Sequence, residues 1–255
     1  MHLILTGATG LVGTAVLDSM IKTQSISKIS ILSRRPVQMA TDAKDPRINV
    51  IIHKDFDSYP PELLEQIKDA NGCVWALGIS QNEVSKEDYI KITKSYTLSF
   101  ANAFASLPSR PPTPFTFLYV SGLGATFQPG RFTPIFGRVK GETELALSQI
   151  RKENPLFQAV SVRAGFIDWF GHESIKNYMP AQGLFKTTMG VAFGGLVRAG
   201  WSSVWSPTEP LGRFLTGVVR GEFEGRLEGK DVDVLDSGMP VVESLAVRRL
   251  MGLDK

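Results

Sequence analysis

Three glycines near the start of the chain have a spacing that suits phosphate binding. Gly7, Gly10 and Gly13 form the pattern G-x-x-G-x-x-G, and an apolar run that predicts a short buried strand precedes them. Apolar residues at helical spacing follow, namely Leu11, Val12, Ala15, Val16, Met20 and Ile21. A strand, a glycine-rich turn and a helix together place backbone N–H groups and a helix N-terminus against a pyrophosphate. The pattern therefore predicts a dinucleotide site, and an ordinary turn that holds three glycines is the alternative.

Each glycine of this turn has its own expected task. We expect Gly7 to permit the tight turn, Gly10 to let the backbone approach the phosphates, and Gly13 to let the helix pack close to the strand. The residues of the turn that are expected to contact the cofactor are Gly7, Thr9, Gly10, Leu11, Val12 and Gly13.

A second cluster of polar side chains follows the next expected strand. Ser33, Arg34 and Arg35 stand where NAD-binding proteins carry an acidic residue for the ribose 2′-hydroxyl, and no acidic residue is present there. Guanidinium groups bind phosphate in a fork and stack on flat rings, so they suit a 2′-phosphate. The turn predicts NADP(H) as the cofactor in preference to NAD(H), and a solvated basic turn is the alternative.

Other kinds of chemistry find little support in the residue pattern. The three histidines, His2, His53 and His172, have no spacing that would set two ligands on one face, so no metal site is expected. A hydrolase has no support either, because the chain contains no G-x-S-x-G motif. The single cysteine, Cys73, lies in an apolar run and is expected to be a core residue; it excludes an intrachain disulfide and fits a reducing compartment.

The bulk properties indicate one globular domain over residues 1–255. A hydrophobic fraction of 43% and a charged fraction of 21% suit an α/β protein of ordinary composition. A net charge of +3 is too small to argue for a nucleic-acid partner. No apolar run reaches the ~18 residues of a membrane span, and the nearest, 189–197, is short and glycine-rich. With neither a signal nor a transit peptide before the first strand, we expect a cytoplasmic protein.

Alternating elements must hold these side chains in place. Strands are expected at 2–6, 28–33, 48–53, 73–77, 115–121 and 158–163, and helices near 11–22, 60–69, 86–106 and 137–152. This alternation predicts an α/β fold with a doubly wound parallel sheet and helices on both faces. After about residue 165 the pattern loosens. Residues 166–240 are therefore expected to form a small substrate-side cap within the same domain, and residues 241–251 a closing helix.

Seven short motifs, spread over nearly the whole chain, add a resemblance to a known family. They are T-G-A-T-G-x-x-G (6–13), S-R-R (33–35), D-F (55–56), A-L-G (76–78), V-S-G-L-G-A (120–125), V-K-G-E-T-E (139–144) and V-R-A-G (162–165). Through them the chain resembles the atypical and extended branches of the short-chain dehydrogenase/reductase superfamily, which are NAD(P)-binding proteins with a Rossmann fold. Within that group it is most similar to the Tat-interacting oxidoreductase-like proteins and related fungal proteins.

The resemblance implies a role for each matching residue. Asp55 would bond the adenine amino group and Phe56 would line the adenine slot, although a solvated turn residue is the alternative for Asp55. Lys140 would bond the hydroxyls of the nicotinamide ribose, and the turn after Arg163 would approach the carboxamide. The residues that would run past the nicotinamide ribose are Ala76, Leu77 and Gly78.

The chain departs from the family at the residue that would transfer the proton. The family has a tyrosine four residues before the lysine, whose charge lowers the pKa of the phenol so that it can donate or accept the substrate proton. This position is Phe136, which has no titratable group. The partner serine falls at Ser121 or at Gly122, and in the second case both hydroxyls are absent. The expected catalytic positions are therefore Lys140, Ser121 and Phe136.

Three functions remain compatible with this departure. The leading expectation is an NADP(H)-dependent oxidoreductase acting on a hydrophobic small molecule, such as an enone or a quinone-like acceptor that needs little acid help. The second is a redox-neutral isomerase or cyclase that uses the same pocket. The third is a non-catalytic NADP(H)-binding regulatory protein. A reductase would take its proton from water or from Tyr119, Asp168, His172 or Tyr178.

Two further expectations concern the pocket and the oligomer. A dry pocket would need aromatic walls, for which the candidates are Phe127, Phe132, Phe136, Phe166, Trp169, Phe170, Phe185 and Phe193. Ordinary core packing is the alternative for these rings. The resemblance implies that a homodimer would form through residues 86–106 and 137–152.

Overall fold

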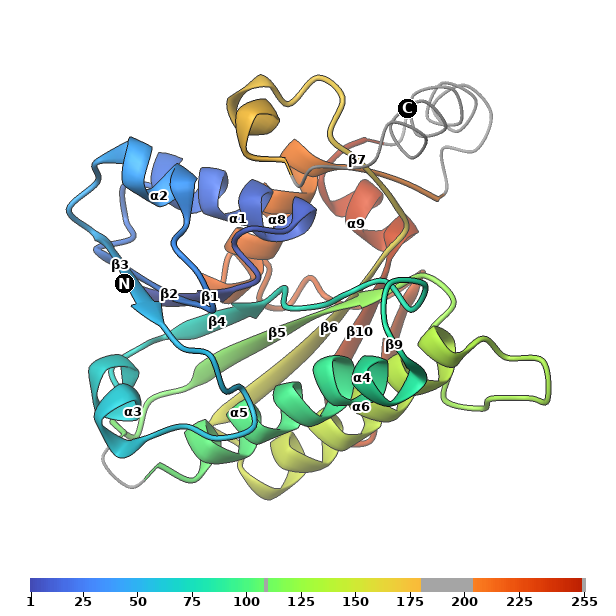
Figure 1. The fold of residues 1–255 in the computed structure, drawn as a ribbon. Coiled ribbons are helices and arrows are strands. Elements are labelled where there is room, and N and C mark those ends of the chain that lie inside the picture. Colours follow the sequence, from blue (N-terminus) through green and yellow to red (C-terminus); the bar gives the residue numbers. More distant parts are fainter. Residues whose placement is uncertain (108–109, 180–203, 254–255) are drawn as a thin grey trace.

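An eight-stranded sheet runs through the centre of the molecule (Figure 1). The computed structural model describes residues 1–107, 110–179 and 204–253, so the predicted apolar run 189–197, Phe185 and Phe193 lie outside the described residues. The strands of the sheet are β1 (His2–Thr6), β2 (Lys28–Ser33), β3 (Ile48–Ile52), β4 (Gly72–Trp75), β5 (Phe115–Gly122), β6 (Phe157–Ala164), β9 (Val232–Val234) and β10 (Pro240–Glu243). In the described ranges, all neighbouring strands are parallel except β9 and β10.

The strand order reverses near the middle of the sheet. From edge to edge it is β3-β2-β1-β4-β5-β6-β10-β9, so the chain winds outward first on one side of β1 and then on the other. In such a sheet a ligand binds beyond the carboxyl ends of the strands where the order reverses, which here means beyond β1 and β4. The prediction of a doubly wound α/β fold is confirmed, and all six strands expected from the sequence are present.

Helices cover both faces of the sheet (Figure 1). On one face lie α1 (Leu11–Lys22), α2 (Gln38–Ala43) and α8 (Thr208–Val219). On the other lie α3 (Pro61–Ile67), α4 (Lys86–Ile90), α5 (Tyr96–Ala105) and α6 (Ile135–Glu153). A π-helical turn over Lys91–Ser95 joins α4 to α5, so the helix expected at 86–106 is nearly continuous. No helix in the described ranges is both long and apolar enough to cross a membrane.

The two faces of the sheet are filled by different side chains. Aliphatic residues from α1 and α8, such as Val16 and Leu215, pack on the first face. The second face holds a cluster of large rings, namely Phe56, Trp75, Phe100, Phe104, Phe115, Phe117 and Phe157. Each buried ring removes a large apolar area from water, so this cluster stabilises the packing of α5 and α6 on the sheet.

The end of the chain differs from its prediction. Residues Pro240–Glu243 form β10 rather than the start of the closing helix, and α9 extends from Ser244 to Leu250. Val241 and Val242 are both fully buried, in the clusters on opposite faces of the sheet. Two consecutive buried apolar residues suit a strand that is covered on both faces, which explains why a helical interpretation of this segment was wrong.

Part of the expected cap belongs instead to the main layers of the fold. α8 packs so closely on α1 that a Cβ at Gly212 would lie 2.4 Å from the Ala15 carbonyl oxygen, and β9 continues the sheet. The apolar face of α8 needs a buried partner, and α1 provides it. Outside the main sheet stand a small sheet of β7 (Phe166–Asp168) with β8 (Trp205–Pro207) and a 3₁₀ helix over Glu173–Tyr178.

Candidate functional site

The first turn of α1 leaves backbone donors free at the carboxyl end of β1. Gly10 is the N-cap residue and has no side chain that could cap the helix. Its N–H donates to the Gly7 carbonyl oxygen at 2.9 Å, and the Thr14 N–H donates to the Gly10 carbonyl oxygen at 2.9 Å. The N–H groups of Leu11 and Val12 have no acceptor within the helix, and they lie at the positive end of its dipole. Such a helix end favours an anionic ligand.

Two of the three glycines are required by the backbone of the protein itself. Gly7 has a φ of +69°, and a Cβ there would lie 2.2 Å from the Ala76 carbonyl oxygen. A Cβ at Gly13 would lie 2.0 Å from the Gly7 carbonyl oxygen. At Gly10 an added Cβ would lie 3.3 Å from the Gly7 carbonyl oxygen, a tight contact that a shift of a few tenths of an ångström would relieve. Gly7 and Gly13 therefore set the shape of the turn, and Gly10 is the least crowded of the three positions.

A cavity of about 380 Å³ opens beside this turn. It is lined by Gly7, Thr9, Leu32, Ser33, Arg34, Arg35, Phe56 and Leu77. Ser33 shapes the basic side of the cavity, since its Oγ donates to the Arg35 carbonyl oxygen at 2.7 Å. Arg34 and Arg35 are exposed, and none of the residues that line the cavity is acidic. The structure thus gathers residues from four separate sequence motifs into one basic cavity with an apolar wall.

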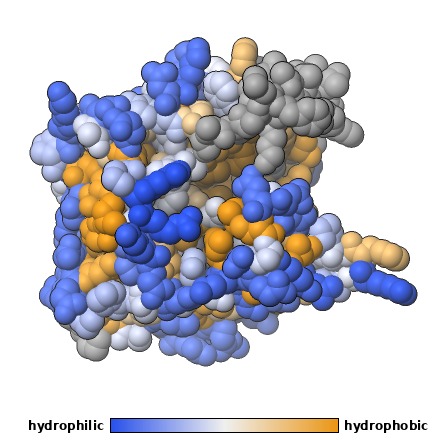
Figure 2. Space-filling view, viewed as in Figure 1, coloured by the Kyte–Doolittle hydropathy of each residue, from blue (hydrophilic) through white to orange (hydrophobic). Residues whose placement is uncertain are grey.

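A second cavity, of about 280 Å³, shares Thr9 and Arg35 with the first. Its other walls include Val37 and Met39, near and within α2, and Tyr178 of the 3₁₀ helix. Apolar surface is visible in the hollow between the layer of α1 and α2 and the layer of α4 to α6 (Figure 2).

Asp55 and Phe56 are adjacent in the sequence, but only Phe56 lines the first cavity. Phe56 is buried and lines the first cavity, whereas Asp55 is exposed and does not line it. The Asp55 carboxylate accepts from the Ser58 hydroxyl at 2.8 Å and from the Asp57 N–H at 3.1 Å, and these bonds hold its pKa below the usual value. Gly78 is exposed, with open space around it.

The other half of the site lies between the end of β5 and the start of α6. Phe136 lies in the first turn of α6, and its N–H donates to Gln81 Oε1 at 3.0 Å. Its ring is near Gly124, where an added Cβ would lie 3.4 Å from Phe136 Cζ. An added Cβ at Gly122 would lie 3.6 Å from Cδ and Cε of Lys140, so Gly122 faces the stem of that lysine.

Lys140 presents an amino group at this end of the site. Its Nζ donates to the Val120 carbonyl oxygen at 3.2 Å and lies 5.4 Å from the centre of the Tyr119 ring. Burial lowers the pKa of Lys140 to about 8, and the negative charge of Glu144 opposes this shift. The neighbouring Ser121 Oγ is buried, with no hydrogen-bond partner among the described residues.

A buried charged network, which the sequence analysis did not identify, adjoins this half of the site. Arg163 donates to both oxygens of Glu144, at 3.1 and 2.6 Å, and to Glu243 at 2.8 Å. Glu144 is fully buried and also accepts from Ser161 at 2.8 Å, and the Arg163 guanidinium lies 4.7 Å from the centre of the Phe127 ring. The sequence signal that could have revealed this network is the arginine inside the apolar strand β6, because a buried charge requires a partner of opposite charge.

Three of the suggested proton donors hold elements of the fold together. His172 contacts Thr208 Oγ1 at 2.9 Å and Asp18 Oδ2 at 3.1 Å, which ties the 3₁₀ segment to α8 and α1. Tyr178 donates to Asp42 Oδ2 at 3.0 Å. Asp168 accepts from the indole N–H of Trp205 at 3.0 Å. The fourth, Tyr119, is fully buried, and burial raises the pKa of its phenol well above the usual value.

The aromatic pocket expected from the sequence is not assembled as a whole. Phe132 is 92% exposed and Phe170 is 66% exposed, so neither ring forms a dry wall in the described structure. Phe132 lies in a turn before α6, and Phe170 lies in the turn that follows β7. In the described ranges no group of three or more histidine, cysteine, aspartate or glutamate side chains could hold a metal ion.

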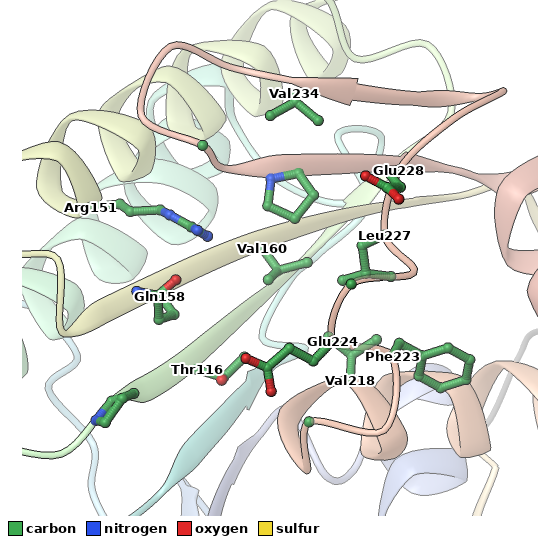
Figure 3. Close-up of a pocket in the computed structure, with 15 residues that line it drawn as sticks. Thr116, Arg151, Gln158, Val160, Val218, Phe223, Glu224, Leu227, Glu228 and Val234 are labelled. Atoms are coloured by element: carbon green, nitrogen blue, oxygen red, sulfur yellow. The ribbon is translucent and has the colours of Figure 1, made fainter.

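The largest of the described cavities, about 550 Å³, lies elsewhere (Figure 3). Its walls include Thr116 and Gln158, at the amino ends of β5 and β6, together with Arg151 and Glu224. None of the residues predicted for the dinucleotide site lines it. Size alone therefore does not locate the site, whereas the strand order and the glycine turn do.

Two fungal relatives match the chain over much of their length, although no known family model matches it. Botcinic acid biosynthesis cluster B protein 16 of Botryotinia fuckeliana is 38% identical over 156 residues, which is 61% of this chain and 98% of that protein. Leucinostatins biosynthesis cluster protein T of Purpureocillium lilacinum is 32% identical over 253 residues, 92% of this chain and 88% of that protein. A more distant relative is "Protein fmp52, mitochondrial" of Aspergillus fumigatus, 23% identical over 91% of this chain and 90% of that protein.

Solved structures share the fold at low sequence identity. The ligand-free aldohexose dehydrogenase of Thermoplasma acidophilum has a TM-score of 0.64 and 13% identity, and the match covers 97% of this chain and 94% of the other. The UDP-glucuronic acid 4-epimerase of Bacillus cereus, solved in complex with NAD, has a TM-score of 0.60 and 13% identity, and the match covers 86% of this chain and 74% of the other.

Proposed function

This chain belongs to the family of the leucinostatins and botcinic acid cluster proteins and has the Rossmann fold of the short-chain dehydrogenases/reductases, and we propose that it is an NADP(H)-dependent oxidoreductase. The substrate in this proposal is a hydrophobic small molecule. Two relatives named for the botcinic acid and leucinostatins biosynthesis clusters support that class of substrate.

One observation carries the choice of cofactor. The cavity beside the glycine turn is lined by Ser33, Arg34 and Arg35 and by no acidic residue. Two exposed guanidinium groups favour a ribose 2′-phosphate, and the free N–H groups of Leu11 and Val12 favour a pyrophosphate next to it. Phe56 and Leu77 supply the apolar wall that an adenine ring requires. We propose that these residues hold the adenosine 2′-phosphate end of NADP(H).

The residues of the other half indicate what kind of acceptor is reduced. When bound, a reduced nicotinamide supplies a hydride. Lys140 would hold the ribose beside it, and Phe136 offers no proton at the position of the family tyrosine. An enone or quinone-like acceptor needs less acid help than a simple ketone, because its negative charge is delocalised after the hydride has been added. We therefore propose an activated, apolar carbonyl compound as the substrate.

A redox-neutral isomerase or cyclase is the second candidate function. Phe136 stands at the position of the family tyrosine. If the family serine aligns with Gly122, neither the tyrosine hydroxyl nor the serine hydroxyl is present near Lys140. A pocket that only positions an apolar substrate would need neither hydroxyl. A regulatory protein that binds NADP(H) without turnover is the third candidate, and only a search for turnover separates it from the other two.

The test begins with binding. Purified protein is titrated with NADPH and with NADH while the quenching of tryptophan fluorescence and the energy transfer to the nicotinamide are followed. We expect NADPH to bind at least tenfold more tightly, about 1.4 kcal/mol. Oxidation of bound NADPH by a panel of enones and quinones would then support the reductase. Failure to bind either dinucleotide would overturn the proposal, and tight binding with product formation but no NADPH oxidation would favour the isomerase.

The cellular setting is also proposed. We place the protein in the cytoplasm as a homodimer formed through residues 86–106 and 137–152. A fluorescent fusion and size-exclusion chromatography with light scattering test the two statements. A mitochondrial signal, as the name of the fmp52 relative indicates for that protein, or a monomer in solution would contradict them.

A further inference from the structure

We propose that Lys140 itself donates the substrate proton, in place of the tyrosine whose position Phe136 occupies; this inference rests on the oxidoreductase function proposed above. In the superfamily that the chain resembles, the lysine assists a phenol. Here the lysine would act directly as the acid.

The first argument is what surrounds the amino group. Phe136 contributes a hydrocarbon ring next to Gly124, and Gly122 contributes only backbone beside the stem of Lys140. Tyr119 is fully buried, and the centre of its ring lies 5.4 Å from Lys140 Nζ. The Ser121 hydroxyl beside it is buried, whereas Lys140 is only half-buried. Among the described residues at this end of the site, we therefore take the ammonium group as the donor that reaches a ligand.

The second argument is the unused hydrogen-bonding capacity of that group. An ammonium group has three N–H donors. The Val120 carbonyl oxygen accepts one of them at 3.2 Å, and no carboxylate of the described residues lies within the 4 Å of an ion pair with Nζ. The remaining donors can bond a ribose hydroxyl and the oxygen of an acceptor at the same time.

The third argument concerns the charges that face Lys140. Glu144, one turn further along α6, is the acidic residue that acts on it, and Arg163 from β6 neutralises Glu144 through two hydrogen bonds of 3.1 and 2.6 Å. Tyr119 of β5 stays neutral because burial raises its pKa. Burial therefore dominates and brings the pKa of Lys140 down to about 8, which suits a general acid at neutral pH.

The proposed step balances in atoms and electrons. A hydride from the reduced nicotinamide forms a C–H bond at the electrophilic carbon of the acceptor, and the C=C or C=O π electrons move toward the carbonyl oxygen. That oxygen takes a proton from Lys140 Nζ, so that an N–H bond breaks and an O–H bond forms. The substrate gains two electrons, the dinucleotide loses two, and the neutral amine of Lys140 takes up a proton from water.

The first experiment measures the titration of Lys140 directly and needs no turnover. The full chain is produced with lysine labelled with ¹³C at Cε, and the shifts are followed by NMR from pH 6 to 11. The Lys140 signal is identified by its absence in Lys140→Arg. We expect its midpoint near pH 8, whereas exposed lysines titrate near 10.4. A midpoint at or above pH 10 would overturn the proposal.

The second experiment separates proton donation from charge. Lys140→Arg keeps the positive charge and can still bond a ribose, but a guanidinium does not release its proton. We expect its NADPH affinity to stay within about threefold of the wild type, while kcat for an enone falls by about 10²-fold or more and the loss of activity above pH 8 disappears. The matched control is Lys68→Arg, since Lys68 pairs with Glu65 at 2.6 Å outside both the site and the proposed dimer interface.

The outcomes keep the two proposals apart. If Lys140→Arg retains the wild-type kcat and pH profile, Lys140 only positions the cofactor, and the inference fails while the oxidoreductase stands. If the wild type binds no NADPH or reduces no acceptor, the oxidoreductase fails and the inference, which rests on it, falls with it. The NMR midpoint then still decides whether Lys140 is an acid of the strength that the structure indicates.

Discussion

The two halves of the proposed dinucleotide site differ in how much of the superfamily pattern they keep. The half beside β1 and β2 has the glycine turn, the open N-terminus of α1 and a basic cavity lined by residues from four motifs. The half beside β5 and α6 keeps Lys140 but has Phe136 and Gly122 around it. In the function proposed above, cofactor binding and proton transfer are separate properties of one fold, and the predictions below test them separately.

The largest effect should come from the backbone of the first half. Gly13→Ala would put a methyl group 2.0 Å from the Gly7 carbonyl oxygen, so the turn would have to move. We expect NADPH binding to fall by more than 100-fold and the free energy of unfolding to fall by about 1–3 kcal/mol. Fluorescence titration and urea unfolding measure the two effects.

Gly10→Ala sharpens this prediction, because the added Cβ would lie 3.3 Å from the Gly7 carbonyl oxygen, a contact that needs a much smaller shift than the one at Gly13. The free energy of unfolding should fall by less than in Gly13→Ala while NADPH affinity falls by about tenfold or more, as the methyl group would take up space proposed for phosphate. Gly130→Ala is a control outside the site, with 4.0 Å to its nearest contact. Wild-type affinity in Gly10→Ala would mean that the phosphates bind elsewhere.

The next largest effect should come from restoring a hydroxyl in the second half. Phe136→Tyr places a phenol four residues before Lys140, and a positioned acid accelerates such reductions by about 10²-fold or more. We expect reductase activity on simple ketones to appear or to rise by about that factor, measured as the oxidation of NADPH. Phe132→Tyr, at a ring that is 92% exposed, should change nothing. If Phe136→Tyr brings no gain with any carbonyl compound, the substrate side has diverged as well.

A smaller effect separates the two cofactors within the first half. Arg34→Ala and Arg35→Ala should each weaken NADPH binding by about tenfold, because each removes one charge-assisted contact with a phosphate of about 1.5 kcal/mol. NADH binding should change less than twofold. Asp55→Asn is the companion variant: its carboxylate is bonded to Ser58 and Asp57, so we expect less than a twofold change with either dinucleotide. Equal losses for NADPH and NADH in the arginine variants would contradict the 2′-phosphate site.

The smallest effect is on stability and follows from the charge of Lys140. Burial places its pKa at about 8 in the folded chain, against about 10.4 in the unfolded chain, so keeping the ammonium in the fold costs stability below pH 8. Lys140→Met should therefore be more stable than the wild type at pH 7 by roughly 1–3 kcal/mol. Between pH 8 and 10.4 the unfolded wild type binds more protons than the folded one.

The stability of the wild type should consequently rise toward that of Lys140→Met across this pH interval. Urea unfolding at pH 7 and at pH 9.5 measures the difference. Lys68→Met, which removes a surface pair with Glu65, should stay within about 1 kcal/mol of the wild type and lack this pH dependence. A destabilised Lys140→Met at both pH values would show that the ammonium group is well solvated in the fold.

The sequence predicts the regular parts of the fold well. The six strands expected from alternating apolar runs are present, and α1 has the expected bounds, Leu11–Lys22. Local patterns suffice here because a strand covered on both faces must be apolar throughout and a helix on a sheet needs one apolar stripe. The prediction is wrong for residues 241–243, because a short apolar run carries no sign of whether a sheet edge is available to it.

The sequence by itself determined the strand–turn–helix motif, the basic turn after β2 and the phenylalanine four residues before Lys140, because each depends on neighbouring residues only. Tertiary structure alone decided which side chains meet: it brought Phe56 into the cavity and left Asp55 outside, set Gly122 against the stem of Lys140, and paired Arg163 with Glu144. The physical reason is that burial and the pKa of Lys140 depend on groups packed from β5, β6 and α6, which are distant in the chain and adjacent only in the folded molecule.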